Sequence, residues 1–229
     1  MKIIIDSRMR KIEKEYLSEY GELIELPYQS SVYDEISSHP DIFFCKINNK
    51  IFSAPNVEVS KKIYCEAGQD NVELEYPFDI RYNVCQIGNS VIHNFKYTDK
   101  KILNYAKEQE LKLIQVQQGY SKCSICPTSD KSCITSDEGI YKKLKQEDID
   151  VLLVKENINL LDKNGFKTKM KGFIGGATAV LKNKFIVFGD SCKLSNKDIL
   201  QEHIQKYNLE LVDFKKLEIV DYGGIVVIE

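Results

Sequence analysis

One short segment carries three of the seven cysteines in this 229-residue sequence. Residues 118–137 read QGYSKCSICPTSDKSCITSD, with Cys123, Cys126 and Cys133 inside eleven positions and the first two in C-x-x-C spacing. Such residues can form a metal site, a redox pair, or one nucleophilic thiolate beside two packing side chains. These interpretations need different partner residues elsewhere in the chain, so the partners decide between them.

The sequence provides few partners for a metal site or a redox pair. A structural zinc site needs four ligands, often two C-x-x-C pairs or one pair with histidines, and the sequence has one such pair and no H-x-x-x-H. A redox C-x-x-C motif normally opens a helix, whereas we expect this one within a strand. We therefore expect no metal ion and no cofactor, with Cys126 and Cys133 as packing residues. For Cys123 two interpretations stay open: a nucleophile and a buried small side chain.

A cysteine nucleophile requires a partner that moves protons, and the sequence has three histidines. His39 stands two residues before Asp41 and ahead of an apolar segment, which makes it the best acid–base candidate, with Asp41 to orient it or to bind a cation. An imidazolium next to Cys123 would favour the thiolate. His93, at the end of a predicted strand, is the second candidate, and His203 is expected to face solvent from a helix.

The remaining candidate residues also lie near the starts of predicted hairpins. Asp221, ahead of Tyr-Gly-Gly, is either a turn residue or a ligand, and Asp79 either caps a turn or binds substrate. Asn83 is a polar residue at the start of a strand, which a substrate-binding pocket would explain. Gly175-Gly176 indicates a close approach of backbones, and we expect both glycines in the same substrate-binding pocket. If these segments converge, the sequence predicts one polar pocket built from distant parts of the chain.

A repeated plan of elements would bring those segments together. Each unit consists of a β-hairpin, a polar link, an amphipathic helix and an apolar strand. Residues 83–116 follow this plan: the hairpin NVCQIGNSVIHN turns at Gly-Asn, Thr98 caps the helix TDKKILNYAKEQ, and LKLIQVQ is the strand.

Similar units precede and follow this one. In the preceding unit the hairpin turns at Asn48-Asn49, with a helix predicted over VEVSKKIYCEAG and a strand over NVELEYP. In a later unit the hairpin turns at Asn183-Lys184, and Ser195 caps the helix that follows. The sequence therefore predicts an array of like units rather than unrelated elements.

One further unit is divided between the two termini. The chain begins with a strand, a helix and a strand, and it ends with a lone apolar strand. Joining the ends regenerates the plan, so we predict a single α/β domain, a five-bladed pseudo-fivefold ββαβ propeller closed by pairing of the N- and C-terminal strands. An open α/β sheet is the alternative. The blades are expected at residues 39–76, 77–117, 118–161, 170–215, and 219–229 joined with 1–28.

This arrangement resembles the pentein fold of the guanidino-group-modifying enzymes, which include arginine deiminase, dimethylarginine dimethylaminohydrolase and the amidinotransferases. His39-Pro40-Asp41 is similar to their His-x-Asp before an apolar strand, and residues 119–127 are similar to their glycine-led segment with the nucleophilic Cys. Asp221-Tyr222-Gly223-Gly224 is similar to their acidic residue near a Gly-Gly pair.

The resemblance implies a hydrolase or transferase that acts on a small guanidino or amidino compound. Cys123 would form a covalent thiouronium intermediate. His39 would protonate the leaving amine and then activate water. Asp41, Asp221 and Asp79 would hold the planar cation, because carboxylate oxygens match its forked N–H groups.

The order of the motifs differs from the family pattern. Here the acidic Gly-Gly unit is last and the Cys unit is central, which requires a circular shift and indicates a separate bacterial branch. The segment FIGGA lacks the family's second substrate-binding carboxylate, a role that Asp79 could take. The competing hypothesis is therefore a non-catalytic binding module, comparable to the ribosome-associated initiation factor of the same fold.

Composition excludes several other classes of function. The net charge is −2, and the basic residues are scattered among acidic ones, so we expect no nucleic-acid partner. No apolar run approaches the roughly 20 residues that cross a bilayer, so we expect no membrane partner either. The apolar start of the chain is too short for a signal peptide, and an odd number of cysteines indicates reduced thiols in the cytoplasm. A small-molecule substrate is the expected partner, and the sequence does not determine the oligomeric state.

Overall fold

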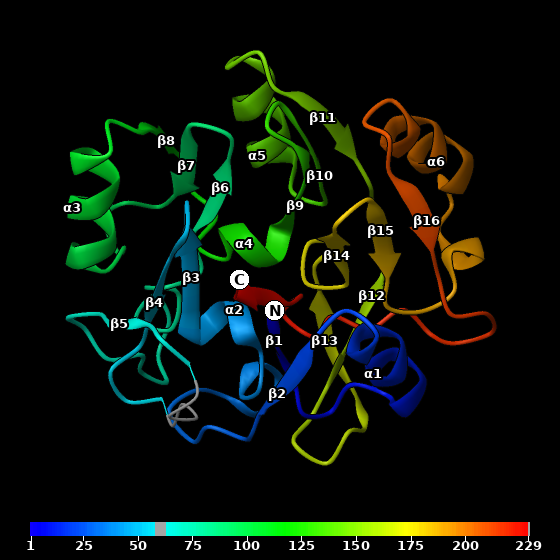
Figure 1. Cartoon of the computed structure of the whole chain (residues 1–229), viewed down its shortest axis with the longest axis horizontal. Helices are drawn as coiled ribbons and strands as arrows, with labels where there is room; N and C mark the ends of the chain where they lie inside the picture. The colour runs from blue at the N-terminus through cyan, green and yellow to red at the C-terminus, as the bar shows by residue number, and fades with distance from the viewer. Residues whose placement is uncertain (58–62, 229) are drawn as a thin grey trace.

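Five small sheets surround the middle of the molecule in the computed structural model, which describes residues 1–57 and 63–228. Figure 1 shows these sheets around the place where the two chain termini lie. Each has three strands, and the middle strand pairs with both of the others. One of these two pairs is antiparallel and the other is parallel. No ladder joins one three-stranded sheet to the next within those two ranges, so the sheets form no continuous barrel.

Within each sheet the strands succeed one another outward from the centre of the molecule. In that spatial order they are β3 (Phe44–Ile47), β4 (Lys50–Ser53) and β5 (Glu66–Ala67); β6 (Cys85–Ile87), β7 (Ser90–His93) and β8 (Lys112–Gln115); β9 (Ile125–Ser129), β10 (Ser132–Thr135) and β11 (Asp150–Leu153); β14 (Thr178–Leu181), β15 (Lys184–Val187) and β16 (Glu210–Val212); and β17 (Val226–Ile228), β1 (Lys2–Asp6) and β2 (Glu22–Leu26).

The predicted pairing of the chain ends is confirmed. Strand β17 runs antiparallel to β1, with Ile3 opposite Val227 and Ile4 opposite Val226. Ile3 and Ile4 are fully buried, so apolar burial accompanies the main-chain hydrogen bonds of this pairing.

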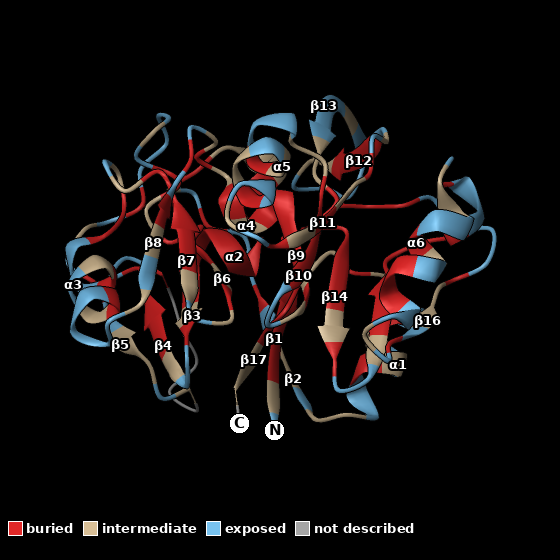
Figure 2. Cartoon of the chain, turned by 90° about the horizontal axis from the view of Figure 1, so that it is seen from above, coloured by how far each residue is buried: buried red, intermediate tan, exposed pale blue. Residues whose placement is uncertain are grey.

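Four of the described helices lie on the outside of the sheets (Figure 1), each between the second and third strands of its sheet. They are α1 (Lys11–Ser18), α3 (Lys100–Glu108), α5 (Glu138–Lys145) and α6 (Lys197–Gln205). Their apolar faces pack inward: Ile102 and Ala106 of α3 are fully buried, for example. Figure 2 shows exposed residues on the outer surfaces of these helices and buried residues in the strands. None of the described helices is long and apolar enough to cross a membrane.

Two single-turn helices lie near the centre instead. Helix α2 (Pro40–Phe43) precedes β3, and α4 (Ser121–Ser124) precedes β9. Two 3-10 helices complete the helical elements of the described chain, η1 (Asp34–Ile36) and η2 (Ser191–Lys193). The predicted C-x-x-C strand is therefore wrong in part: Cys123 lies in α4, and only Cys126 lies in β9.

Three predicted local features also differ from the structure. The cap of α3 is Asp99, whose carboxylate accepts backbone N–H groups of the first turn, because the Thr98 hydroxyl bonds His93 instead. The cap of α6 is Asn196, because Ser195 bonds the Glu156 carboxylate. The later hairpin turns at residues 182–183, where the backbone of residue 182 has a φ of 55°.

One predicted strand was placed incorrectly, and the described end of one predicted helix contains β5 instead. The strand expected over NVELEYP is absent, because β5 (Glu66–Ala67) occupies the parallel position beside β4. The helix expected over VEVSKKIYCEAG falls partly on residues 58–62, outside the described residues. An additional hairpin, β12 (Ile158–Leu161) and β13 (Lys167–Gly172), was not predicted, because the polar sequence KTKMKG lacks an apolar face.

Candidate functional site

The two short central helices bring His39, Asp41 and Cys123 together. His39 is the N-cap of α2 with an extended backbone (φ −72°, ψ 118°), and Pro40 occupies the first helical position, where its missing N–H costs nothing. Asp41 lies in the same turn, and Cys123 lies in α4. One nitrogen, one carboxylate oxygen and the sulfur of these three residues all lie within 4.8 Å of one another. The separation of His39 and Cys123 therefore permits acid–base contact directly or through one water molecule.

All three side chains are buried. His39 is 0% exposed, Asp41 1% and Cys123 2%. Within the described part of the chain, both ring nitrogens of His39 and both carboxylate oxygens of Asp41 lack a hydrogen-bond partner. Buried polar groups without partners are rare in proteins and are concentrated where a ligand or reaction uses them.

Asn83 holds the start of α4 in place. Its side-chain oxygen accepts the backbone N–H groups of Lys122 (2.8 Å) and Cys123 (3.1 Å). Its side-chain N–H₂ group donates to the Cys123 sulfur (3.1 Å) and to the backbone oxygen of Asp41 (3.0 Å). Asn83 was predicted to bind substrate, but these four contacts use its polar atoms, so it positions the thiol relative to α2.

His39 lies between two carboxylates. Its Nδ1 is 3.8 Å from an oxygen of Asp221, and its Nε2 is 3.8 Å from an oxygen of Asp6. Asp6 forms an ion pair with Arg8 at 2.6 Å. Asp6 was missed from the sequence, although a charged residue directly after the apolar run Ile3–Ile5 is a signal that could have indicated it.

The carboxylate of Asp221 accepts backbone hydrogen bonds, as expected of a turn residue. Its two carboxylate oxygens accept the backbone N–H groups of Phe173 and Gly223, each at 2.8 Å. A Cβ atom at Gly176 would lie 1.9 Å from Oδ1 of Asp221, and a Cβ at Gly175 would lie 2.5 Å from the backbone oxygen of Cys123. The predicted close backbone approach at this glycine pair is therefore present. Asp221 packs against Gly176, and the backbone of α4 packs against Gly175.

Burial sets the protonation states in this cluster. It raises the pKa of Cys123 well above the usual value of a thiol, and the Asp41 and Asp221 carboxylates raise it further. It lowers the pKa of His39, assisted by the Arg8 cation. Burial, opposed by the Lys122 cation, raises the pKa of Asp41 to about 6. Burial and the Asp41 charge raise that of Asp221 to about 7.

These directions favour a neutral thiol and a neutral imidazole near pH 7. They do not support the predicted thiolate–imidazolium pair as the resting state of the protein. The same pKa shifts show what would change this resting state. A cation beside the sulfur would favour the thiolate, because an opposite charge stabilises the ionised form.

Asp79 lies outside the three-residue cluster. One of its oxygens accepts the hydroxyl of Tyr120 at 2.5 Å, and the Tyr120 hydroxyl also lies 2.8 Å from that of Tyr33. The other Asp79 oxygen has no partner among the described residues, and burial raises the pKa of this carboxyl. Tyr33 and Tyr120 pack against the core cluster that contains Cys123.

The other two histidines have structural contacts. His93 bonds the Thr98 hydroxyl (2.6 Å) and the backbone oxygen of Gly119 (3.0 Å), and burial lowers its pKa to about 4. His93 therefore anchors the loop before α4. His203 was expected to face solvent, which is wrong: it is 5% exposed and its Nε2 lies 2.9 Å from the Ser132 hydroxyl. Strand β10 covers this face of α6.

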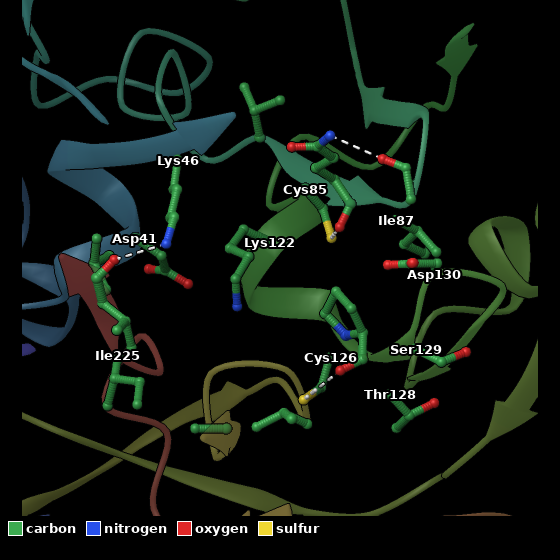
Figure 3. A pocket seen from close by; sticks show the side chains of 18 of the residues that line it. Asp41, Lys46, Cys85, Ile87, Lys122, Cys126, Thr128, Ser129, Asp130 and Ile225 are labelled. Atoms are coloured by element: carbon green, nitrogen blue, oxygen red, sulfur yellow. Dashed lines mark hydrogen bonds between the residues drawn. The ribbon is translucent and has the colours of Figure 1, made fainter. Parts of the chain in front are cut away.

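A cavity of about 640 Å³ lies along the centre of the molecule. Residues of β3, β6, β9, β14 and β17, the innermost strand of every three-stranded sheet, line it. Figure 3 shows Lys122 and Asp41 pointing into this cavity from α4 and α2. Asp41 therefore belongs both to the buried cluster and to the cavity wall.

The buried cluster also has the chemistry of a metal-binding set. Sulfur, imidazole nitrogen and carboxylate oxygen are common ligands of zinc, and His39, Asp41 and Cys123 offer one each. The prediction of no metal considered only ligands spaced within one sequence motif, C-x-x-C or H-x-x-x-H, and such spacing does not reveal a set contributed by two separate helices.

Solved structures show what this fold is similar to. A dimethylarginine dimethylaminohydrolase in adduct with S-methyl-L-thiocitrulline has a TM-score of 0.51 and 8% identity, covering 93% of this chain and 92% of that one. Agmatine deiminase of C. jejuni has a TM-score of 0.51 and 10% identity, covering 93% and 86%. Dimethylarginine dimethylaminohydrolase of Pseudomonas aeruginosa, in complex with citrulline, has a TM-score of 0.50 and 10% identity, covering 93% and 91%. The chain therefore has the mixed α/β fold of the pentein guanidino-modifying enzymes, as the sequence motifs predicted.

Sequence comparison gives a second result. No curated protein is similar to this chain in sequence. The sequence profile of the family of unknown function DUF6873 matches residues 4–226, nearly the whole chain. The chain therefore belongs to the DUF6873 family.

Proposed function

We propose that this protein is a cysteine-dependent hydrolase or transferase acting on a small guanidino or amidino compound. The observation that carries the proposal is the meeting of sulfur, imidazole and carboxylate within 4.8 Å at the centre of the fold. The likeness of the fold to guanidino-modifying enzymes supports the same kind of chemistry, although it does not identify a substrate.

The proposal includes a closed ring as the scaffold. The five three-stranded sheets would be the blades of one pentein domain that spans the whole chain, joined where β17 pairs with β1. In such a ring the segments before each innermost strand meet near one axis. This arrangement accounts for active groups that come from α2, from α4 and from residue 221.

Substrate binding would itself activate the nucleophile. The Asp41 and Asp221 carboxylates raise the pKa of the Cys123 thiol in the resting protein. A guanidinium group bound beside these carboxylates would offset their charge and would add an attractive cation next to the sulfur. The thiol proton would leave to neutral His39, whose ring lies within the same 4.8 Å cluster.

The reaction would then proceed in two balanced stages. The Cys123 sulfur forms a bond to the guanidinium carbon, and His39 returns the proton to the nitrogen that leaves as an amine or ammonia. A water molecule next loses a proton to His39 and attacks the thiouronium carbon. The carbon–sulfur bond breaks as the carbon–oxygen double bond forms, and the hydroxyl proton passes to the sulfur. This restores the thiol and releases a ureido product, and His39 gives its proton to solvent. An amine that replaced water in this stage would make the enzyme a transferase.

The other residues would support these steps. Asn83 donates an N–H to the sulfur and lowers the pKa of the Cys123 thiol. Asp221 would orient His39 through Nδ1. Gly175 and Gly176 would permit the close packing of α4 against residue 221. Asp79 would bind substrate only if Tyr120, whose hydroxyl donates to it, moved away.

A turnover screen tests the proposal. Purified protein would be incubated with arginine, agmatine, methylated arginines and creatine-like compounds, and released ammonia or amine would be measured. The proposal predicts product from at least one compound and its loss in both Cys123→Ser and His39→Gln. Turnover that persisted in Cys123→Ser would refute the nucleophile.

A non-catalytic binding module is the second candidate. The observation in its favour is that Cys123 and His39 are 2% and 0% exposed, and this burial shifts the pKa of each toward its neutral form. Binding of a guanidino compound without turnover, unaffected by Cys123→Ser, would support this candidate.

A further inference from the structure

Half of the exposed large apolar side chains in residues 1–57 and 63–228 lie in two short segments. The acidic loop is residues 70–78, which precede β6, and the basic hairpin is residues 162–171, the turn after β12 and most of β13. Their exposed apolar side chains are Leu74, Tyr76, Phe78, Phe166 and Met170, with exposed fractions of 58%, 54%, 40%, 70% and 45%. Apolar side chains gathered on a surface in this way commonly mark a contact with another protein.

The two segments carry opposite charges. The acidic loop contains no basic residue and three acidic ones, Asp70, Glu73 and Glu75. The basic hairpin contains one acidic residue, Asp162, and four basic ones, Lys163, Lys167, Lys169 and Lys171. Each segment therefore combines apolar side chains with the charge that complements the other segment.

Neighbouring residues neutralise only part of this charge. Arg81 lies 3.5 Å from two of the loop carboxylates, and Lys163 lies 3.4 Å from a carboxylate outside the hairpin. Glu75, Lys169 and Lys171 make no ion pair with any residue that the structure describes. These three side chains keep their charge available for a partner.

Both segments adjoin the same aromatic ring. Tyr76 of the acidic loop packs on Tyr120 with ring centroids 5.9 Å apart. Phe173, the second residue after the basic hairpin, packs on Tyr120 with ring centroids 6.0 Å apart. Tyr120 and Phe173 pack against the core cluster that contains Cys123. The two segments therefore border one part of the surface, next to the buried candidate site.

The protein's own hydrogen bonds hold both segments in shape. In the basic hairpin, the Asp162 carboxylate accepts the backbone N–H of Phe166 at 2.9 Å, which fixes the exposed ring at the turn. In the acidic loop, the backbone N–H of Phe78 donates to the backbone oxygen of Glu75 at 2.8 Å. Surfaces that are ordered before binding lose less conformational entropy when they bind.

We propose that the acidic loop and the basic hairpin form the interface of a symmetric dimer of this chain. A two-fold axis brings one surface against itself, so the acidic loop of each copy meets the basic hairpin of the other and the complementary contact is made twice. Together the two segments approach the roughly 20–30 residues per side of a standard interface. The interface would lie next to Cys123 in both copies, and the inference does not depend on the proposed function.

Sedimentation velocity over a range of protein concentrations tests the proposal. The chain has a mass of 26.4 kDa, and the dimer would have twice that mass. Two charge-reversed proteins are compared with wild type. The hairpin variant combines Lys169→Glu with Lys171→Glu, and the loop variant combines Glu73→Lys with Glu75→Lys.

A matched control reverses two lysines far from both segments in sequence. Lys100→Glu with Lys107→Glu, in α3, makes the same change in net charge as the hairpin variant. All the substituted side chains are exposed, so every variant should remain folded, which far-UV circular dichroism checks.

Wild type should form a dimer that dissociates on dilution and in high salt, which screens the charges. Each reversed protein on its own places like charges opposite each other twice, so its dimer Kd should rise by at least about 10-fold. The α3 control should dimerise as wild type does.

An equimolar mixture of the two reversed proteins gives the sharpest result. Both segments are acidic in the hairpin variant and both are basic in the loop variant, so neither protein suits itself. Between the two proteins both contacts are complementary, and the mixture should form a heterodimer with close to wild-type affinity.

Four outcomes would overturn the inference. They are a wild-type mass of one chain at every concentration from micromolar upward, a dimer that both reversals leave unchanged, a loss of dimer in the α3 control equal to that in the hairpin variant, and reversed proteins that stay monomeric when mixed.

Discussion

Asp221→Asn should change how the stability of the protein depends on pH. The pKa of Asp221 is raised from 3.8 to about 7 in the folded protein, by burial first and by the Asp41 charge second. Between these two values the unfolded chain releases this proton while the folded chain keeps it, so the free energy of unfolding falls as pH rises. A shift of about 3 units corresponds to a loss on the order of 4 kcal/mol between pH 4 and pH 8.

The variant removes this titration but keeps the shape of the side chain. Asn offers one oxygen to the two backbone N–H groups that Asp221 accepts, which costs about 1–3 kcal/mol at every pH. We therefore expect wild type to be the more stable protein at pH 4.5, by about 1–3 kcal/mol. This advantage falls by up to about 1.4 kcal/mol per unit as pH rises, so the variant becomes the more stable protein by pH 7.5. Urea unfolding followed by far-UV circular dichroism suits this test, because the chain has no tryptophan.

A matched control is available in Asp190→Asn. Asp190 also accepts two backbone N–H groups, but these hydrogen bonds lower its pKa to about 2. Its contribution is therefore present above pH 4 and is lost only in strong acid, so its difference from wild type should stay constant from pH 4.5 to 8.5. A constant difference for Asp221→Asn as well would refute the raised pKa. A difference that grew with pH would indicate an ion pair with charged His39 and would contradict the neutral resting site.

Three further predictions follow from the same contacts. Gly176→Ala should destabilise the protein by about 1–3 kcal/mol in calorimetric unfolding, because its Cβ would lie 1.9 Å from an oxygen of Asp221. The control Gly139→Ala in α5, whose Cβ would lie 3.1 Å from one carboxylate oxygen, should cost little stability. Equal losses of stability in the two variants would contradict the close packing at Gly176. Asn83→Ala should slow alkylation of Cys123 and destabilise the fold by about 1–3 kcal/mol, since it removes the N–H that bonds the sulfur; an unchanged labelling rate would exclude a positioning role. Dialysis against a chelator should leave turnover unchanged, whereas a loss that Zn²⁺ restores would show that the cluster works as a metal site.

Local patterns predicted most of the scaffold. The hairpin turns at Asn48-Asn49 and at residues 88–89 were correct, because alternating apolar residues and turn residues constrain only their immediate neighbours. The pairing of the terminal strands was also predictable, since each end lacked the partner that the repeated plan requires. Strand β5 was misplaced because two residues carry too short a pattern to recognise.

The site was predicted less completely than the scaffold. His39 and Cys123 were identified by motif, and the structure brings them together. The flanking Asp6 and the cavity-facing Lys122 were not identified, because no local pattern reports which charged side chains the tertiary fold buries. The resting charge state was missed for the same reason: burial, which decides the pKa of both His39 and Cys123, is a property of the assembled fold.

The central claim is that a cationic group activates the thiol of Cys123. The most direct test compares alkylation by 2-chloroacetamidine, which carries an amidinium cation, with alkylation by neutral 2-chloroacetamide. Labelling of each cysteine would be followed by peptide mass spectrometry and normalised to a free small thiol, with exposed Cys192 as the internal control. The account predicts that the amidinium reagent labels Cys123 before the other cysteines, while the neutral reagent labels Cys192 first. Slow labelling of Cys123 by both reagents, at the same normalised rate, would contradict it.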